Sequence, residues 1–201
     1  MKINYDNKMM EIINSFLDKK TILLHSCCGP CSSACIDRLK DYFDITVIYY
    51  NPNIEPLDEY IHRKNEQIRL LKEWNIKFMD CDYENDIWTN KTKYLREELE
   101  GGKRCSVCFG IRLKYTAKKA LDKGFDYFGT TLTVSPHKNS ELINKIGEGI
   151  GINLGIKFLY SDFKKKEGYK KSIEFSKQYN LYRQDYCGCL YSKEGIKKYE
   201  E

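Results

Sequence analysis

Seven of the nine cysteines in this chain of 201 residues fall into three short groups, and this grouping is the clearest chemical signal in the sequence. The groups are HSCCGPC at 25–31, RCSVC at 104–108 and DYCGC at 185–189. Thiolates bind soft metals and iron–sulfur clusters, and a pair of thiols releases two electrons when it forms a disulfide. The groups therefore predict a metal centre, a redox pair, or both.

The second group is a Cys-x-x-Cys pair, Cys105 and Cys108, at the start of an expected helix. Residues three apart on a helix face the same side. The free N–H groups and partial positive charge of the first helical turn stabilise thiolates, and Lys103 and Arg104 add positive charge. We interpret the pair as metal ligands. Thioredoxin-like redox pairs share this spacing, but their fold does not need the other thiols.

The first group contains two adjacent cysteines, Cys27 and Cys28, followed by a Gly-Pro bend that allows both side chains to reach one ligand. Together with Cys105 and Cys108 they make four thiolates, the usual number for a [4Fe–4S] cluster. A tetrahedral zinc site with four cysteine ligands fits the same count. The adjacent pair favours iron–sulfur, because zinc sites more often use two separated pairs. Cys31 is left open between a fifth ligand and a packed residue.

The third group is Cys187 and Cys189 on either side of Gly188, which permits a tight backbone. A disulfide in so small a ring is strained and easily reduced, which suits a redox-cycling pair. Alternatively, the two thiols hold a second metal with Asp185.

Strand and helix patterns alternate along the chain, which predicts an α/β fold: a Rossmann-like parallel sheet with helices on both faces. Ligands of such sheets sit beyond the carboxyl ends of the strands, where the loop with Cys27 is expected. We interpret 1–20 as an N-terminal helical extension and 21–201 as one α/β catalytic domain that ends in the Cys-x-Cys segment. The expected strands are 21–26, 43–53, 76–83, 125–137 and 157–163, and the expected helices are 31–42, 57–75, 85–102, 105–124, 140–155 and 168–182.

Composition limits the partners and the compartment. The net charge of +5 permits a polyanionic partner without requiring one, and the densest basic patch is KKK at 164–166, either a solvated face or a nucleic-acid contact. No apolar run approaches the roughly 20 residues of a membrane span, and the first twenty residues are too polar for a signal peptide. We expect a cytoplasmic protein without a membrane partner, whose thiols are reduced.

Taken together, the motifs resemble the epoxyqueuosine reductases of the QueH type. The matching stretches are LLHSCCGPC, YYNPNIEPLDEYIHRKNEQIRLL, RCSVCFGIRL, FGTTLTVSPHKN and QDYCGCLYS, which span nearly the whole chain. The resemblance implies a cobalamin-independent enzyme that reduces epoxyqueuosine at the wobble position of tRNA to queuosine, the last step of queuosine biosynthesis, with electrons from an external donor.

The same resemblance implies the site residues. It implies a redox-active disulfide between Cys187 and Cys189, and an additional iron ion whose ligands the sequence does not assign. Removing an epoxide oxygen as water takes two electrons and two protons, so a proton donor is needed. Asp185, Tyr186 and His137 are the candidates, and we group Asp185 with the Cys-x-Cys pair as catalytic. The implied ligands of a [4Fe–4S] cluster are Cys27, Cys28, Cys105 and Cys108.

The expected fold also resembles that of adenine-nucleotide hydrolases of the PP-loop kind, whose first loop, Ser-Gly-Gly-x-Asp-Ser, wraps pyrophosphate. Here HSCCGPCS takes its place, so the paired glycines that let the backbone approach phosphate are missing. Two alternatives remain at this point. One is an ATP-using, cluster-containing tRNA sulfur transferase of the PP-loop type, and the other is a zinc-stabilised RNA-binding module.

Overall fold

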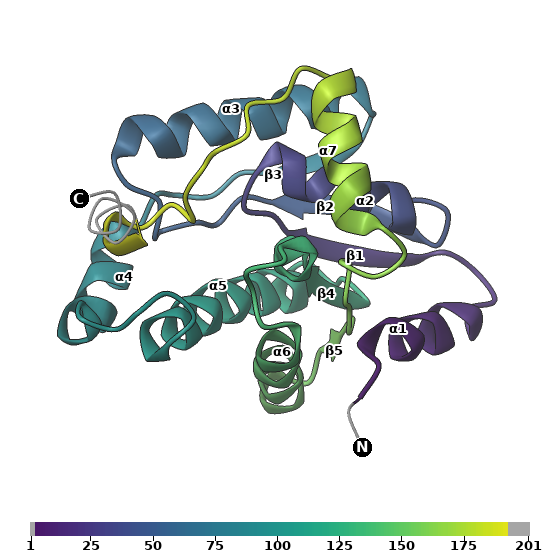
Figure 1. Ribbon diagram of the computed structural model, residues 1–201. Helices are drawn as coiled ribbons and strands as arrows, with labels where there is room; N and C mark the ends of the chain where they lie inside the picture. The colour runs from purple at the N-terminus through teal and green to yellow at the C-terminus, as the bar shows by residue number, and fades with distance from the viewer. Residues whose placement is uncertain (1–2, 193–201) are drawn as a thin grey trace.

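A five-stranded parallel sheet forms the centre of the computed structural model, which describes residues 3–192 (Figure 1). The strands lie in the order β3-β2-β1-β4-β5, so the chain runs outward from β1 through β3 and then returns to the other side of β1. Ligands of open sheets bind at this reversal, beyond the carboxyl ends of β1 and β4. The bounds are β1 (Lys20–His25), β2 (Phe43–Ile48), β3 (Lys77–Met79), β4 (Tyr127–Thr130) and β5 (Lys157–Phe158).

Residues 3–192 form seven α-helices: α1 (Tyr5–Asn14), α2 (Gly29–Leu39), α3 (Leu57–Glu73), α4 (Asn85–Thr92), α5 (Lys103–Asp122), α6 (Ser140–Leu154) and α7 (Gly168–Gln178). Helices α2, α3 and α7 cover one face of the sheet and α5 and α6 the other, while α4 packs against α5 (Figure 1). The predicted parallel sheet with helices on both faces is therefore confirmed.

The central strand β1 is buried from Ile22 to His25, and its residues 22–24 are all apolar. Ile22 and Leu24 pack in one core cluster with residues of α2, and Leu23 packs in a second cluster with residues of α5. This alternation is what a strand requires of a sheet covered on both sides. Met9 and Ile13 of α1 also belong to the first cluster. The division of the chain at residue 20 stays a prediction.

The expected strand over 125–137 is shorter than the sequence pattern indicates. It ends at Thr130, whose side-chain oxygen accepts a hydrogen bond from the Leu132 N–H and so starts a 3₁₀ helix, η2 (Thr131–Val134). Residues 131–134 are buried but not extended. As a result, the chain leaves the sheet early, and residues 135–138 line a cavity together with Cys27 and Cys31.

Two expected helices are also shorter. The helix expected over 85–102 ends at Thr92 and continues only as a 3₁₀ turn, η1 (Lys93–Leu95), before α5 begins. The helix expected over 168–182 ends at Gln178, because Asn180 adopts a positive φ of 46° that a right-handed helix excludes.

The segment 179–192 runs along the outside of α3 toward the carboxyl edge of the sheet (Figure 1). Arg69 of α3 donates to the backbone oxygens of Tyr179 and Asn180, and Glu66 accepts from the Tyr182 N–H at 2.9 Å. Helix α3 thus delivers the third cysteine group to the edge where β1 ends. Within residues 3–192, no helix is long and apolar enough to cross a bilayer.

Candidate cysteine centre

The loop after β1 is fixed by hydrogen bonds before it reaches the cysteines. The Ser26 N–H extends the sheet by donating to the Ile48 oxygen at 3.0 Å, and the Ser26 hydroxyl donates to Gln67 Oε1 at 2.6 Å. Asn51 Nδ2 donates to the Ser26 oxygen at 2.8 Å. Because β2, the loop after it and α3 all hold Ser26, the two cysteines that follow start from a defined position.

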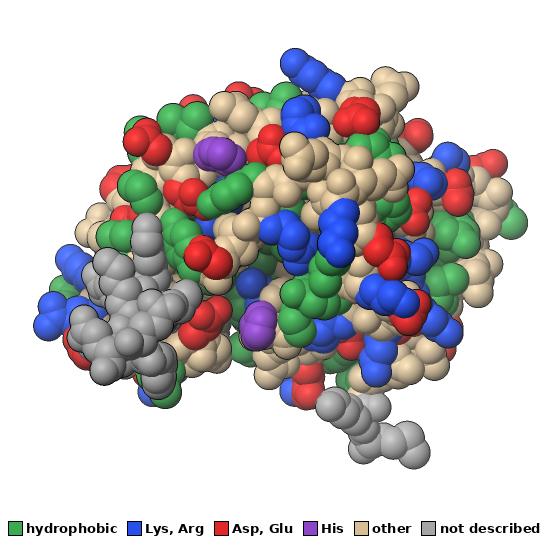
Figure 2. All heavy atoms as spheres, turned by 45° about the horizontal axis from the view of Figure 1, so that its top comes forward, with side chains coloured by type: hydrophobic (Ala, Val, Ile, Leu, Met, Phe, Trp, Pro, Cys, Tyr) green, Lys and Arg blue, Asp and Glu red, His purple; other side chains and the backbone are tan. Residues whose placement is uncertain are grey.

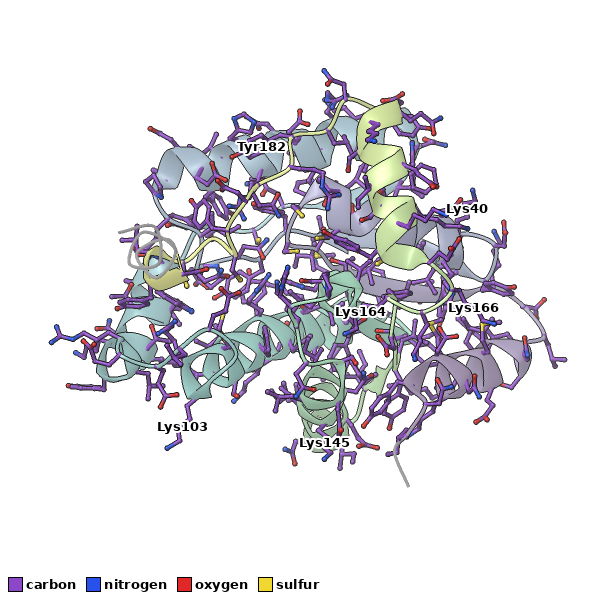
Figure 3. The ribbon with its side chains drawn as sticks, in the orientation of Figure 1. Lys40, Lys103, Lys145, Lys164, Lys166 and Tyr182 are labelled. Carbon is purple, nitrogen blue, oxygen red and sulfur yellow. The ribbon has the colours of Figure 1, made fainter. Side chains whose placement is uncertain are left out.

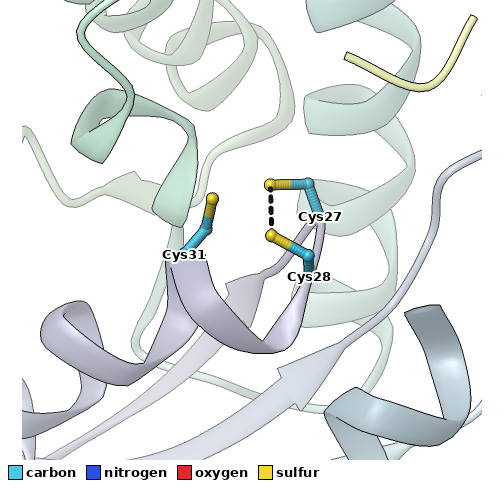
Figure 4. Close-up of side chains that lie close together, drawn as sticks. All are labelled: Cys27, Cys28 and Cys31. Carbon is cyan, nitrogen blue, oxygen red and sulfur yellow. Dashed lines mark hydrogen bonds between the residues drawn. The ribbon is translucent and has the colours of Figure 1, made fainter. Parts of the chain in front are cut away.

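Three sulfurs meet at the start of α2: those of Cys27, Cys28 and Cys31, all within 4.8 Å of one another (Figure 4). The Cys27 and Cys28 sulfurs are 3.8 Å apart. Cys28 is the N-cap of α2 in an extended conformation, and Cys31 lies one turn further along. Among the residues that the structure describes, this is the only group of three or more Cys, His, Asp or Glu side chains that lie this close. Cys31, left open by the sequence, belongs to the group.

The three thiols share protons. Hydrogen bonds from Cys28 and Cys31 hold the pKa of Cys27 well below its usual range, and the charges of Lys138 and Arg112 act in the same direction. Hydrogen bonding to Cys27 in turn raises the pKa of Cys28 to about 12 and raises that of Cys31 as well. One thiolate is therefore favoured in the metal-free trio, and a metal would replace the remaining protons.

Side chains from distant elements complete this centre. Gln184 Nε2, on the segment that follows α7, donates to Cys28 Sγ at 3.1 Å. Lys138, in the loop after η2, lies near the same sulfurs. Its burial alone would lower its pKa, but the thiolates of Cys187, Cys27 and Cys31 raise it above its ordinary value. Positive charge and N–H donors therefore face the sulfurs, as a thiolate site requires.

The other two cysteine groups lie together in a small cavity between α4, α5 and the C-terminal segment. Trp88 of α4 packs against Cys108 and Cys189, and the Gly101 N–H donates to Cys105 Sγ at 3.2 Å. Burial raises the pKa of Cys105, of Cys108 and, to about 12, of Cys189. The cysteines that line this cavity are Cys105, Cys108, Cys187 and Cys189.

A larger cavity of about 660 Å³ opens above the trio of sulfurs. Cys27, Cys31 and Asp185 line it, and Cys187 and His137 line both cavities. Figure 2 shows a hollow on one face of the molecule with Lys and Arg side chains gathered beside it. All three cysteine groups thus reach one edge of the sheet, although the pairing of the first group with Cys105 and Cys108 around one cluster stays a prediction.

The Cys-Gly-Cys turn rests on the loop after β2. The Glu55 N–H donates to the Gly188 oxygen at 2.9 Å, and Gly188 has a φ of +122° that L side chains rarely adopt. Arg63 of α3 donates to the Cys187 oxygen at 3.4 Å. These contacts hold the turn beside the cavity without using either sulfur, and both cysteines are free thiols.

The candidate proton donors differ in their surroundings. Asp185 and His137 are exposed and line the larger cavity. The Tyr186 hydroxyl donates to the Glu55 oxygen at 2.8 Å, so this proton points to backbone. Outside the centre, Cys35 is fully buried in the core and Cys81 is half-buried, where it donates to the Tyr49 oxygen.

Sequence reasoning missed three residues of the centre: Gln184, Lys138 and Arg112. Arg112 follows Cys108 by four positions on α5, and residues at this spacing lie on one side of a helix, so the pattern contained a usable signal. Its Nη1 lies 4.0 Å from Cys108 Sγ. Gln184 and Lys138 lie near the sulfurs only because of the tertiary fold, and their spacing from the cysteines in the sequence does not indicate this contact.

Comparison with known proteins places the chain. The family model for epoxyqueuosine reductase QueH matches residues 22–195. The chain belongs to the QueH family. A QueH from Staphylococcus epidermidis is 43% identical over 97% of this chain and 87% of its own length, and one from Streptococcus pyogenes is 43% identical over 95% and 78%. A QueH from Thermotoga maritima is 34% identical over 86% and 90%.

The solved structures that resemble this QueH family member agree on the fold. The U34-tRNA thiolase NcsA from Methanococcus maripaludis, solved with its [4Fe–4S] cluster, superimposes with a TM-score of 0.59 over 94% of this chain and 67% of its own, at 15% identity. A predicted tRNA methyltransferase subunit from Methanocaldococcus jannaschii gives a TM-score of 0.54 over 79% of this chain and 74% of its own, at 14% identity. Both likenesses confirm the predicted fold class, an α/β fold with a Rossmann-like parallel sheet.

Proposed function

We propose that this chain reduces epoxyqueuosine at the wobble position of tRNA to queuosine, the last step of queuosine biosynthesis, without cobalamin and in the cytoplasm. Membership in the QueH family is the observation that carries the proposal. It also favours a reductase over the two alternatives, a tRNA sulfur transferase and a zinc-stabilised RNA-binding module. The loop after β1 supports the same choice, because it presents three sulfurs where a pyrophosphate-binding loop would present backbone N–H groups.

The donor chemistry of the centre fits a [4Fe–4S] cluster. Such clusters are held by cysteine thiolates, and here thiol sulfurs gather under two positively charged side chains and an amide donor. When bound, the cluster would supply electrons to the substrate one at a time. We assign its ligands to Cys27, Cys28, Cys105 and Cys108, with Cys31 as the competing donor from the first group.

The larger cavity is the proposed binding site for the modified base. At about 660 Å³ it is in the size range of small-ligand pockets. Cys27 and Cys31 line it together with Asp185 and His137. We propose that Asp185, with His137 as the second candidate, donates the proton that the departing epoxide oxygen needs. Both side chains are exposed and so exchange protons with water.

Cys187 and Cys189 are the proposed redox pair. Oxidation of two thiols to a disulfide releases two electrons and two protons, the number needed to remove one epoxide oxygen as water. An external reductant would then regenerate the thiols. The competing assignment is that Cys187, Cys189 and Asp185 hold an additional iron ion. Cys187 lines both cavities, which suits either role.

The tRNA backbone is expected to contact the basic loop before α7. Lys164 and Lys166 extend from this loop (Figure 3). Lys164 Nζ donates to the Lys138 oxygen at 2.9 Å, which connects the loop to the rim of the cavity. Tyr169 and Arg183 also line that cavity and supply a ring and a guanidinium for base stacking.

Anaerobic conversion of a defined substrate tests the proposal. The protein is purified without oxygen, mixed with tRNA that carries epoxyqueuosine and a chemical reductant, and the digested nucleosides are analysed by mass spectrometry. We expect a brown protein with broad absorption near about 400 nm and a product that lacks one oxygen atom. Colourless protein that holds only zinc and leaves the nucleoside unchanged would refute the proposal. Tests with ATP would then show whether sulfur transfer is the activity.

A further inference from the structure

Arg112 is a fully buried cation that makes no ion pair with a carboxylate in the described part of the chain, residues 3–192. Its side chain lies on α5, one turn beyond Cys108, and the residue is only 1% exposed. The other arginine that is equally buried, Arg63, pairs with Glu59 at 2.6 Å. A buried charge without a counter-ion is costly, so something at this place must balance the guanidinium.

The nitrogen and oxygen partners of Arg112 do not supply negative charge. Its Nη2 donates to Asn51 Oδ1 at 2.6 Å and its Nε donates to His25 Nε2 at 3.3 Å. Because His25 Nε2 accepts this hydrogen bond, that nitrogen carries no proton and the imidazole is neutral. The third hydrogen-bond contact of its side chain is with a sulfur.

The sulfurs near Arg112 come from more than one cysteine group. Arg112 Nη1 lies 4.0 Å from Cys108 Sγ, in the Cys-x-x-Cys group. Arg112 also lines the larger cavity together with Cys27 and Cys31 of the first group and Cys187 of the third. The anions that can balance its charge are therefore the thiolates of the proposed cluster site.

Arg112 is also linked to the loop of the first group by hydrogen bonds. Asn51 accepts from Arg112 with Oδ1, and its Nδ2 donates to the oxygen of Ser26. Ser26 directly precedes Cys27. A continuous path thus runs from Cys108 through Arg112 and Asn51 to the start of the adjacent cysteines, and it sets the distance between helix α5 and the loop after β1.

We propose that Arg112 is the positioning residue of the cluster site, where it joins the Cys-x-x-Cys helix to the adjacent-cysteine loop and supplies the buried positive charge that the cluster requires. The inference rests on the proposed cluster. A fixed cation next to an iron–sulfur cluster stabilises the more negative, reduced form and so raises the reduction potential. A shared anchor also pre-arranges ligands that come from two distant parts of the chain.

Two substitutions separate the charge from the geometry. Arg112→Gln removes the charge but keeps an amide donor, whereas Arg112→Lys keeps the charge and loses the planar fork of donors. Arg38→Gln is the matched control. Arg38 of α2 pairs with Asp6 of α1 at 2.6 Å, and neither residue lines either of the two cavities described above. Each protein is reconstituted anaerobically, and the readouts are cluster loss to a chelator, the reduction potential, and the melting temperature with and without the cluster.

We expect Arg112→Gln to lose the cluster about 10–100-fold more readily and to lower the reduction potential of what remains. Arg112→Lys should restore the potential toward that of the unaltered protein. The melting temperature of Arg112→Gln should fall more with the cluster bound than without it, whereas Arg38→Gln should lower both equally and leave the potential unchanged.

Three outcomes would overturn the inference: an unchanged potential in Arg112→Gln, equal shifts in the Gln and Lys variants, or an equal loss of melting temperature in both states. Failure of Arg112→Gln to fold without the cluster would be a fourth such outcome, since it would show a structural role. If the unaltered protein carries no cluster, the proposed function itself fails. That result differs from a loaded protein whose Arg112 variants behave normally.

Discussion

Gly188 lies between the two cysteines of the third group. The substitution Gly188→Ala adds one methyl group there and so tests how tightly the turn is packed. Its φ of +122° is one that L side chains rarely adopt. A Cβ at this position would lie 2.9 Å from Ile54 Cγ1 and 3.3 Å from Arg63 Nη1. Ile54 is 1% exposed, so it has little room to move away.

The expected cost of Gly188→Ala follows from these two effects. The unfavourable backbone conformation costs about 1–3 kcal/mol, and forcing a methyl group into packed surroundings costs about 1–3 kcal/mol more. Alanine also restricts the unfolded chain more than glycine does, which stabilises the folded variant by about 0.4–1 kcal/mol. We expect a net destabilisation of roughly 2–4 kcal/mol. The loss cannot exceed the free energy needed to detach the segment 179–192 from α3, because detachment would relieve the strain at residue 188.

Urea denaturation and cysteine labelling measure this effect. The midpoint should fall by about 1 M or more, and Cys187 and Cys189 should react with a thiol reagent sooner than in the unaltered protein. Gly149→Ala is the control, because a Cβ at Gly149 meets nothing within 4 Å and alanine stabilises a helix interior by about 0.5–1 kcal/mol. Equal midpoints for the two variants, or unchanged labelling in Gly188→Ala, would refute the reasoning.

Four further predictions concern the metal, the redox pair, the tRNA and pH. Cys28→Ala should lower iron content sharply and abolish reduction, while Cys81→Ala should leave both nearly intact; equal losses would mean that the thiols are grouped wrongly. Cys189→Ser should keep its iron yet fail with thiol reductants if the pair is a disulfide, whereas an iron count lower by about one per chain would assign the pair to a second iron. Replacing the lysines at 164–166 with glutamine should weaken tRNA binding and flatten its salt dependence, as fluorescence titration would show; unchanged affinity would make the run a solvated face. Hydrogen bonds from the Thr21 N–H and hydroxyl hold the pKa of Asp126 below its usual range. The Asp126 carboxylate therefore stabilises the fold above the pKa of an unfolded aspartate, and this stabilisation is lost as pH falls through the folded pKa. Asp126→Asn should remove that part of the acid dependence of unfolding.

Periodicity and burial made the architecture predictable. The apolar run that ends at His25 and the helical spacing of α3 each follow from local rules, and parallel order follows from their alternation. The lengths of the elements were less predictable. Residues 131–134 are buried as a 3₁₀ helix, because the Thr130 side-chain oxygen accepts a backbone hydrogen bond outside the sheet.

The residues of the candidate site that lie in short cysteine motifs were predictable from the sequence. Those that reach the site only through the tertiary fold were not. The grouping of Cys27 with Cys28 is visible in the sequence, but that of Cys31 depends on how α2 starts. Gln184 lies 156 positions from Cys28, and its contact depends on α3 holding the intervening segment. Arg112 was also missed, although its helical spacing from Cys108 was a signal that could have identified it.

The segment 179–192 contributes residues to the candidate site but to none of the strands or helices described above. A chain cut short after Gln178 would retain every strand and α-helix described here, together with most of the core. It would lack Gln184, Asp185 and the Cys-x-Cys pair, and the larger cavity would lose one wall. During synthesis, the cysteines of the first group leave the ribosome long before the third. The sheet can therefore form around an incomplete centre, and proteolysis or premature termination near the end of the chain would yield a folded protein without the third cysteine group.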